Sequence, residues 1–216
     1  MQFDLERQAL IASGLGEENR IAEYLGKLSS LSGQFMSQES LPSSALTRAR
    51  GLFDWLWKDR PTRYRHQGNY RLYHVIDAQI NEGTPTVGNC LGLTLLYNCL
   101  LRRIGIEAEA LYLENAFGLG PHLLTLLNIG DFSIDIENIL PEGFDYRGHR
   151  SDPSREIWGG RELVADIYHS VGNELFEKGK FSEALRTYNR ALELNPHYER
   201  ARLNKAIVLD RINMLE

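Results

Sequence analysis

The sequence predicts an α+β fold: helices first, a buried helix at the centre, then an antiparallel sheet and further helices. Three observations support this order. The run from Cys90 to Gly105 (CLGLTLLYNCLLRRIG) is apolar on nearly every helical face, which is typical of a central helix. After it, alternating and extended runs flank a glycine-containing turn, as in a β-hairpin. From residue 165 onward the pattern is again helical.

Composition limits the classes of protein to consider. The 216 residues are enough for one well-buried domain and a small second one, and 43% hydrophobic content is ordinary for a globular protein. No polybasic block is present, which argues against nucleic acid or an anionic membrane surface as a partner. The acidic N-terminus is unlike a signal peptide, and no run approaches the roughly 18 apolar residues of a membrane span.

The two cysteines point to a reducing compartment. Cys90 and Cys99 are about 180° apart on one helix at ~100° per residue, so they cannot form a disulfide with each other. Free thiols are usual in cytosolic proteins, and we therefore expect a cytoplasmic protein.

The first 44 residues form an expected N-terminal helical segment. Apolar residues at helical spacing predict a helix over 19–31, and a Ser-rich loop follows at 32–44. Residues 45–58 are amphipathic with a wide apolar face, and Pro61 ends that helix. A short helix is expected around 73–80, followed by a loop at 82–85 that leads to the cysteine helix.

The cysteine helix carries signals at both ends. Asn89 is a good N-cap, because its side-chain oxygen can accept from a free backbone N–H, and Gly105 stands where a C-terminal cap is expected. Cys90 therefore lies in the first turn. Unpaired N–H groups and the helix dipole favour a thiolate there, so this stretch can present a nucleophilic sulfur.

The sheet follows the helix. Residues 107–112 alternate with the period of a strand, and 122–128 and 132–138 flank the turn Ile129-Gly130-Asp131. Of the six histidines, His122 begins a strand that must pack near the central helix, so it is the expected base for the cysteine.

The third residue of such a site depends on strand register. Asp135 and Glu137 share the polar face of the partner strand. If Asn128 pairs with Asp131, Glu137 lies opposite His122 and Asp135 lies diagonally, but a bulge at Gly130 would shift this pairing. Spacing alone leaves both acids open.

These motifs resemble the transglutaminase-like superfamily of papain-type folds over residues 45–145. The resemblance rests on a cysteine opening an apolar helix, a strand beginning Pro121-His122, an aspartate on the next strand, and Leu-Arg-Arg-Ile-Gly-Ile closing the helix. It implies a catalytic triad of Cys90, His122 and Asp135, and so favours Asp135 over Glu137.

Such a triad would catalyse acyl transfer. Cys90 would attack an amide or ester carbonyl, and His122 would protonate the leaving group. The Cys90 N–H would supply one oxyanion donor, with Asn69 or Gln79 as candidates for the second. We expect no cofactor and no metal, because neither CxxC nor HxxxH spacing occurs.

The C-terminal part is divided into an expected linker at 146–164 and a repeat segment at 165–216. Residues 165–198 show a small residue at Gly172, a turn at 178–181, a stripe of Ala184, Tyr188 and Ala191, and a closing Asn195-Pro196. This pattern resembles one tetratricopeptide (TPR) repeat, and 199–213 resembles the first helix of the next.

Two functions follow from these features. The first is a cysteine-dependent protease, amidase or transglutaminase that hydrolyses or transamidates a peptide bond. The second is a protein-interaction scaffold with the same fold and no turnover, because a fold can persist with an inactive site. In both, a peptide or protein partner can bind through the TPR helices.

Overall fold

A computed structural model describes residues 3–38, 44–130 and 132–214 of the chain. The expected turn residue Asp131 and positions 39–43 of the Ser-rich loop lie outside the described residues. The helices are α1 (Leu5–Ala12), α2 (Glu18–Met36), α3 (Ala45–Asp59), α4 (Leu72–Ile80), α5 (Cys90–Arg103), α6 (Gly160–Glu177), α7 (Phe181–Leu194) and α8 (Glu199–Asn213). The strands are β1 (Glu109–Leu113), β2 (His122–Ile129), β3 (Phe132–Ile136) and β4 (Glu156–Trp158).

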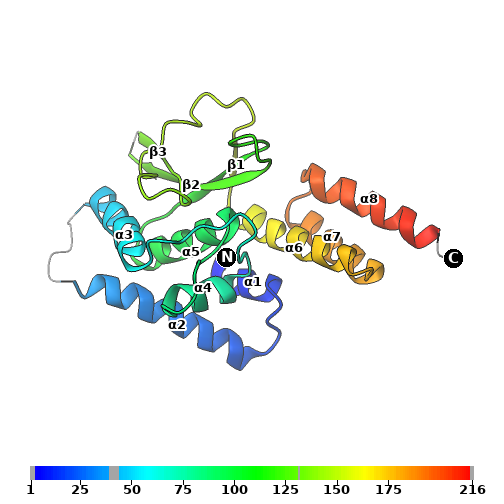
Figure 1. Ribbon diagram of the computed structural model, residues 1–216, viewed down its shortest axis with the longest axis horizontal. Helices are drawn as coiled ribbons and strands as arrows, with labels where there is room; N and C mark the ends of the chain where they lie inside the picture. The colour runs from blue at the N-terminus through cyan, green and yellow to red at the C-terminus, as the bar shows by residue number, and fades with distance from the viewer. Residues whose placement is uncertain (1–2, 39–43, 131, 215–216) are drawn as a thin grey trace.

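The fold is a mixed α and β structure with a small antiparallel sheet. Its strands lie in the order β3-β2-β1-β4. Figure 1 shows the sheet above helix α5, with α2 and α4 below it and α6 to α8 extending to one side. Helix α5 is therefore the central layer, and eleven of its residues are buried, as its all-round apolar pattern predicts.

The β2–β3 hairpin turns one residue later in the chain than in the register we considered. Ile129 pairs with Phe132 and Asn128 with Ser133, so Asn128 does not pair with Asp131. Gly130 in this turn has φ 59°, a left-handed conformation that glycine adopts without a steric penalty. The ladder is displaced by two residues, and Asp135 lies opposite Leu126.

A chain of buried polar side chains joins α5 to the sheet. The Thr125 hydroxyl donates to Asn98 Oδ1 at 2.7 Å, and Asn138 Nδ2 donates to Thr125 Oγ1 at 2.9 Å and to Thr94 Oγ1 at 3.2 Å. Asn98 Nδ2 also donates to the backbone oxygen of Glu109 at 3.1 Å. These bonds fix the position of the helix along β2, because an unpaired buried amide is costly.

The N-terminal end of α5 is in close contact with the chain that precedes α4. A Cβ built on Gly92 would lie 2.4 Å from the backbone oxygen of Asn69, and one on Gly88 would lie 2.7 Å from the same atom. That oxygen accepts from the Asn89 N–H at 3.0 Å. Glycine at both positions is what lets the two segments hydrogen-bond.

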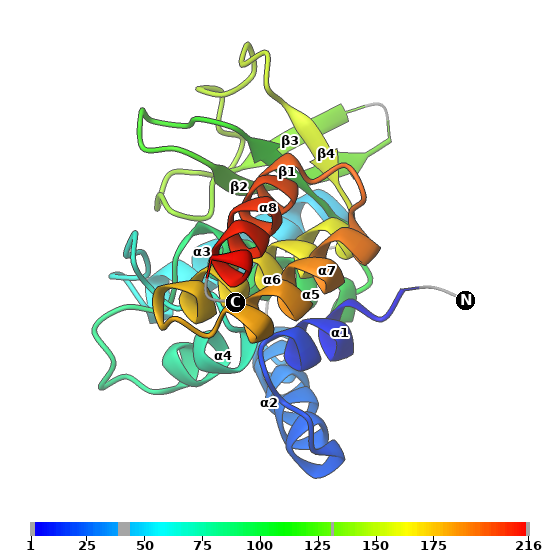
Figure 2. The same cartoon turned by 90° about the vertical axis from the view of Figure 1, so that its right-hand side faces the viewer.

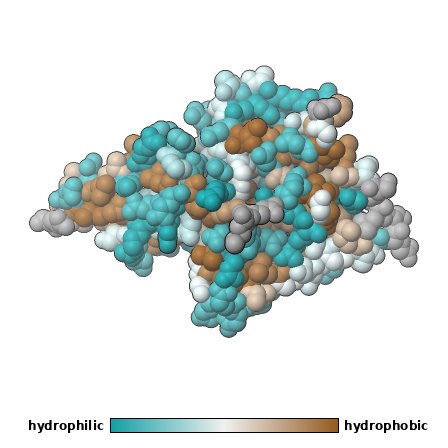
Figure 3. Space-filling view, turned by 180° about the vertical axis from the view of Figure 1, so that it is seen from behind, coloured by the Kyte–Doolittle hydropathy of each residue, from teal (hydrophilic) through white to brown (hydrophobic). Residues whose placement is uncertain are grey.

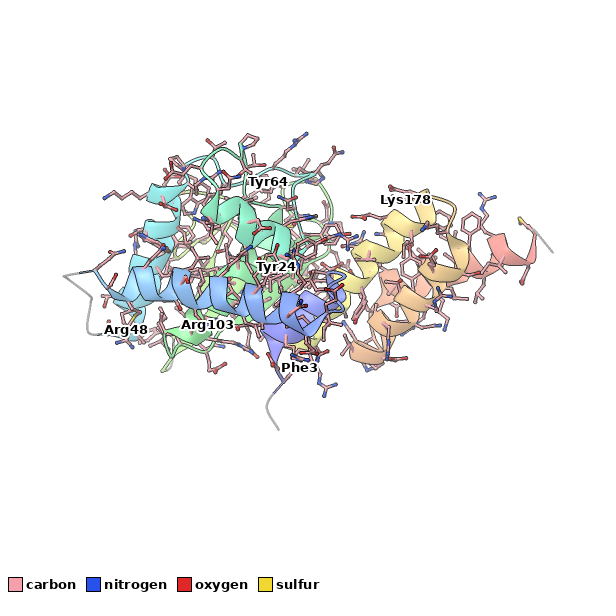
Figure 4. The ribbon with its side chains drawn as sticks, turned by 90° about the horizontal axis from the view of Figure 1, so that it is seen from below. Phe3, Tyr24, Arg48, Tyr64, Arg103 and Lys178 are labelled. Carbon is pink, nitrogen blue, oxygen red and sulfur yellow. The ribbon has the colours of Figure 1, made fainter. Side chains whose placement is uncertain are left out.

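The N-terminal helices pack against the core rather than standing apart. Arg103, at the end of α5, pairs with Glu6 of α1 through Nε at 2.7 Å, and its Nη1 donates to Ser29 of α2 at 2.6 Å. Tyr24 of α2 donates to Asp77 of α4 at 2.7 Å, and Figure 4 shows the positions of Arg103 and Tyr24 along α2.

The expected linker contains an edge strand. β4 pairs with β1 through Ala110 and Trp158, and helix α6 begins directly afterwards at Gly160. Trp158 is buried and stacks on Tyr112 with ring centroids 4.2 Å apart. Trp158 therefore anchors this segment to the sheet, and the expected linker at 146–164 includes strand β4 and the first residues of α6.

The C-terminal helices have the packing that the repeat pattern predicts. A Cβ on Gly172 of α6 would lie 2.5 Å from the Tyr188 ring of α7, so this glycine allows the two helices to approach. Figures 1 and 2 both show α8 on the same side of α6 as the sheet. Among the described residues, no helix is long and apolar enough to cross a membrane.

Replacing Gly92 with alanine should destabilise the protein by about 1–3 kcal/mol, because the new methyl group overlaps the Asn69 backbone. Gly33 on α2 is the control, since a Cβ there has nothing within 4 Å and alanine should stabilise by up to about 1 kcal/mol. Urea unfolding measures both changes. Equal changes in stability for the two substitutions would contradict the close contact between Gly92 and the Asn69 backbone.

Glu174 of α6 links that helix to the chain before α4 and should make stability depend on pH. Arg71 Nη2 lies 2.7 Å from Glu174 Oε2, and Tyr70 donates to the other oxygen. Burial raises the pKa of Glu174, but the bonds to Tyr70 and Arg71 outweigh it, so the pKa lies below its ordinary value.

The stabilisation from Glu174 is therefore present above the ordinary glutamate pKa of about 4.3 and is lost as the pH falls through the lower folded value. We expect Glu174→Gln to destabilise the protein at pH 7 and to have little effect in acid below both values, as measured by urea unfolding. Glu193→Gln, which removes an exposed pair with Arg190, should change little at either pH.

Candidate functional site

Cys90 is the first residue of α5 and is half-buried. The Asn89 side chain accepts from the Gly92 N–H at 3.0 Å, so the predicted N-cap is present. The Cys90 N–H has no acceptor within the helix, because the first four amides of a helix never do. The sulfur therefore lies where the helix dipole favours negative charge. Cys99 is fully buried, and burial raises the pKa of its thiol.

His122 is the first residue of β2 and lines the same cavity as Cys90. Its Nε2 is 2.8 Å from Glu137 Oε2, so Nδ1 is the ring nitrogen that this carboxylate does not contact. Burial lowers the pKa of His122, but the hydrogen bonds to Cys90 and Glu137 outweigh it and raise the pKa to about 10. The structure thus brings two of the three predicted residues together.

Glu137 is the acid that meets His122. Its side chain is fully buried, and it follows the last residue of β3, where the chain leaves the sheet. The Glu137 N–H donates to the Gly143 oxygen at 2.8 Å, and the Ile139 N–H lies 3.4 Å from Oε1. Burial raises the pKa of Glu137, yet contacts with His122 and His149 bring it below the ordinary value.

The structure does not bring Asp135 to His122. Asp135 lies opposite Leu126 and accepts two bonds from Arg155, at 2.7 and 3.0 Å. The same guanidinium donates to the His149 backbone oxygen at 2.9 Å, so the pair holds the loop between β3 and β4. The placement of Asp135 beside His122 is therefore corrected: the later turn shifts β3 by two residues along β2, away from His122, and the side chain of Glu137 reaches the ring instead.

His149 is a site residue that sequence reasoning missed. It comes from the loop between β3 and β4, is 6% exposed, and has Nε2 3.3 Å from Glu137 Oε2. That contact lacks hydrogen-bond geometry, and this nitrogen is one of the few buried side-chain atoms of the described residues without a hydrogen-bond partner. The sequence shows only that His149 lies in a loop that contains Gly and Pro, and this pattern does not indicate a functional site.

A cavity of about 340 Å³ opens beside Cys90 and His122. Strand β1 and its loop form one wall, and helix α6 and Arg200 of α8 form the other. The cavity is lined among others by His66, Tyr112, Leu119, Asp166, His169 and Arg200. The repeat helices thus contribute directly to the cleft that contains the cysteine.

Both amides considered as a second oxyanion donor already donate a hydrogen bond elsewhere. Gln79 donates to Asp59 at 3.1 Å and accepts from Arg63, and Asn69 donates to the Val87 oxygen at 3.2 Å. The Tyr64 hydroxyl is 3.3 Å from His66 Nδ1, within hydrogen-bonding distance, and burial raises the pKa of Tyr64.

Comparison with known proteins supports the C-terminal part of the fold. The model of the TPR repeat family matches residues 172–211, within α6 to α8. An uncharacterized protein of Methanocaldococcus jannaschii, MJ0572, is 44% identical over 45 residues, which are 21% of this chain and 52% of that protein. The chain therefore spans about half the length of this relative. No solved structure matches.

The Asp135–Arg155 pair should be structural. Asp135 is 3% exposed, so Arg155→Leu leaves a buried carboxylate without its partner and should cost about 3 kcal/mol. The double variant Asp135→Asn/Arg155→Leu removes the charge as well and should cost less than the single change. Urea unfolding of the wild type and the two variants measures the difference. A double variant that loses more stability than Arg155→Leu would contradict a structural role of the pair.

Proposed function

We propose that the chain is a cysteine-dependent acyl-transfer enzyme with a transglutaminase-like core, in which Cys90, His122 and Glu137 act as the triad. The observation that carries the proposal is the buried His122 between the Cys90 thiol and the Glu137 carboxylate. A nucleophile, a base and a group that orients the base are the parts that such catalysis requires.

The order of elements also supports this core. A cysteine opens a helix, a histidine begins a strand of the adjacent sheet, and an acid follows the neighbouring strand, as in the superfamily that the sequence resembles. The departure is the acid: a glutamate just beyond the strand stands where the resemblance implies an aspartate on it. The longer side chain of Glu137 offsets its different backbone position.

The chemistry follows from these positions. The Cys90 sulfur attacks the carbonyl carbon of an amide, a C–S bond forms, and the C–N bond breaks as the leaving amine takes a proton from His122. Water or a second amine then attacks the thioester and loses a proton to His122, which releases the acyl group and restores the sulfur. Glu137 stabilises the imidazolium and holds the ring orientation.

The substrate class is a peptide or protein amide. The cavity beside Cys90 is open and polar, with Asp166, His169 and Arg200 on the wall supplied by α6 and α8. TPR repeats generally mediate protein–protein interaction, so a repeat that walls the cleft would select the protein that enters it. The oxyanion would accept from the Cys90 N–H.

A scaffold without turnover is the second candidate. The TPR match and the exposed apolar residues of α8, which include Leu203 and Ile207, favour partner binding by this helix. Figure 3 shows hydrophobic surface along the C-terminal helices, on the left of that view. A scaffold requires no reactive Cys90, so measuring acylation of Cys90 distinguishes the scaffold from the enzyme.

We expect p-nitrophenyl acetate, a generic acyl donor, to acetylate Cys90 with a burst of p-nitrophenol in buffer containing EDTA. Peptide mass spectrometry locates the acetyl group, and buried Cys99 serves as the internal control because it should stay unmodified. His122→Gln should slow the burst about 100-fold or more, because general-base assistance is lost. Glu137→Gln should slow it less, since the ring keeps a hydrogen-bond partner.

Asp135→Asn is the matched control for Glu137→Gln, as both replace a buried acid next to β2 by its amide. It should acylate at close to the wild-type rate. An unreactive wild-type Cys90, or a burst of equal size in Cys90→Ala, would contradict the enzyme and leave the scaffold. An Asp135→Asn burst as slow as that of Glu137→Gln would show that the triad assignment is wrong.

A further inference from the structure

The His122, Glu137 and His149 side chains form a buried cluster of three metal-ligand types. One ligand atom from each lies within 4.8 Å of the others, and all three residues are buried. His122 Nε2 and His149 Nε2 both approach the same carboxylate oxygen, at 2.8 and 3.3 Å. They come from three places in the fold: the start of β2, the turn after β3 and the loop before β4.

These separations suit a zinc ion. Zinc binds imidazole nitrogen and carboxylate oxygen at about 2.0–2.2 Å in tetrahedral geometry, which places neighbouring ligand atoms roughly 3.3 Å apart. The His149 contact already has that separation, and the His122 contact needs only a small opening. Two histidines and a glutamate are also a ligand set of known catalytic zinc sites, with a fourth position left open.

His149 provides an independent reason to expect a ligand. Its side chain is more than nine-tenths buried, and its Nε2 points at the cluster without a hydrogen-bond partner among the described residues. A buried imidazole nitrogen left unpaired costs free energy. Arg155 donates a hydrogen bond to the His149 backbone oxygen, which holds the loop and keeps His149 beside Glu137.

We propose that His122, Glu137 and His149 bind a zinc ion that reversibly switches off Cys90. A metal on His122 Nε2 uses the lone pair of that nitrogen and leaves the proton of the neutral ring on Nδ1. His122 can then no longer take a proton from the thiol or from an attacking nucleophile. The consequence for Cys90 rests on the proposed function, whereas binding of the metal does not.

The sequence could not show this site, because its ligands are separated by 15 and 12 residues and lack a paired motif. Cys90 is not part of the ligand set, since the cluster of ligand atoms among the described residues consists of His122, Glu137 and His149. Zinc binding is therefore measurable in a chain that lacks the nucleophile.

The first experiment measures zinc affinity of the full chain carrying Cys90→Ala, by competition with a chromogenic chelator. We expect one zinc per chain, and a loss of affinity of about 100-fold when His149→Ala is added. His197→Ala, at an exposed histidine before α8, should leave the affinity unchanged. Absence of stoichiometric zinc, or equal affinity with and without His149, would overturn the site.

Cobalt gives a second readout that does not depend on the His149 variant folding. Co²⁺ added to the Cys90→Ala chain should give the intense visible bands of a four-coordinate site, and the wild type should give the same bands with no added sulfur-to-metal absorption. A strong sulfur band in the wild type would show that Cys90 is itself a ligand, against the proposal.

The second experiment tests the switch on the wild-type chain. Stoichiometric zinc should slow acetylation of Cys90 by p-nitrophenyl acetate at least about tenfold, and EDTA should restore the rate. Zinc that binds without slowing acetylation would overturn the switch. A Cys90 that is unreactive even with EDTA would instead contradict the proposed function, while the binding results in the Cys90→Ala chain would stand.

Discussion

The contact between helix α5 and strand β2 is the constraint on which the rest of the structure depends. Its buried hydrogen bonds run from Asn98 through Thr125 to Asn138 and Thr94, and they allow one position of the helix along the strand. Cys90 opens that helix, and His122 opens that strand. Because Asn138 directly follows Glu137, the same bonds also fix where the carboxylate lies. One polar network thus aligns three groups that the chain supplies from separate elements.

The buried carboxylate of Glu137 explains why two histidine side chains surround it. A fully buried carboxylate is costly unless it is paired, and Glu137 lies between two imidazoles rather than among water. Its neighbour on the strand, Asp135, is also buried and is paired with a different cation, Arg155. The two acids therefore have separate partners and separate tasks: one orients a ring, and the other holds the loop that closes the cluster.

The sequence predicted the elements with strong periodic or capping signals and missed those that depend on tertiary contacts. The caps and apolar faces of the cysteine helix, the hairpin after it and the Gly172–Tyr188 packing could all be read locally. The third site residue could not, because the register depends on which residues around Gly130 form the turn. Strand β4 has three residues in polar surroundings, and only the burial of Trp158 against Tyr112 makes it a strand. His149 reaches the site through a loop whose path no pattern describes.

The absence of a spacer between β4 and α6 has a mechanical consequence. Strand β4 ends at Trp158, and helix α6 begins at Gly160. A force applied to the C-terminal helices would therefore be transmitted directly to the edge strand of the sheet. The hydrogen bonds between β4 and β1 would bear that load, and β1 borders the cavity through Tyr112. The C-terminal helices and the sheet are therefore mechanically coupled. A force on those helices would reach the wall of the cavity that contains Cys90.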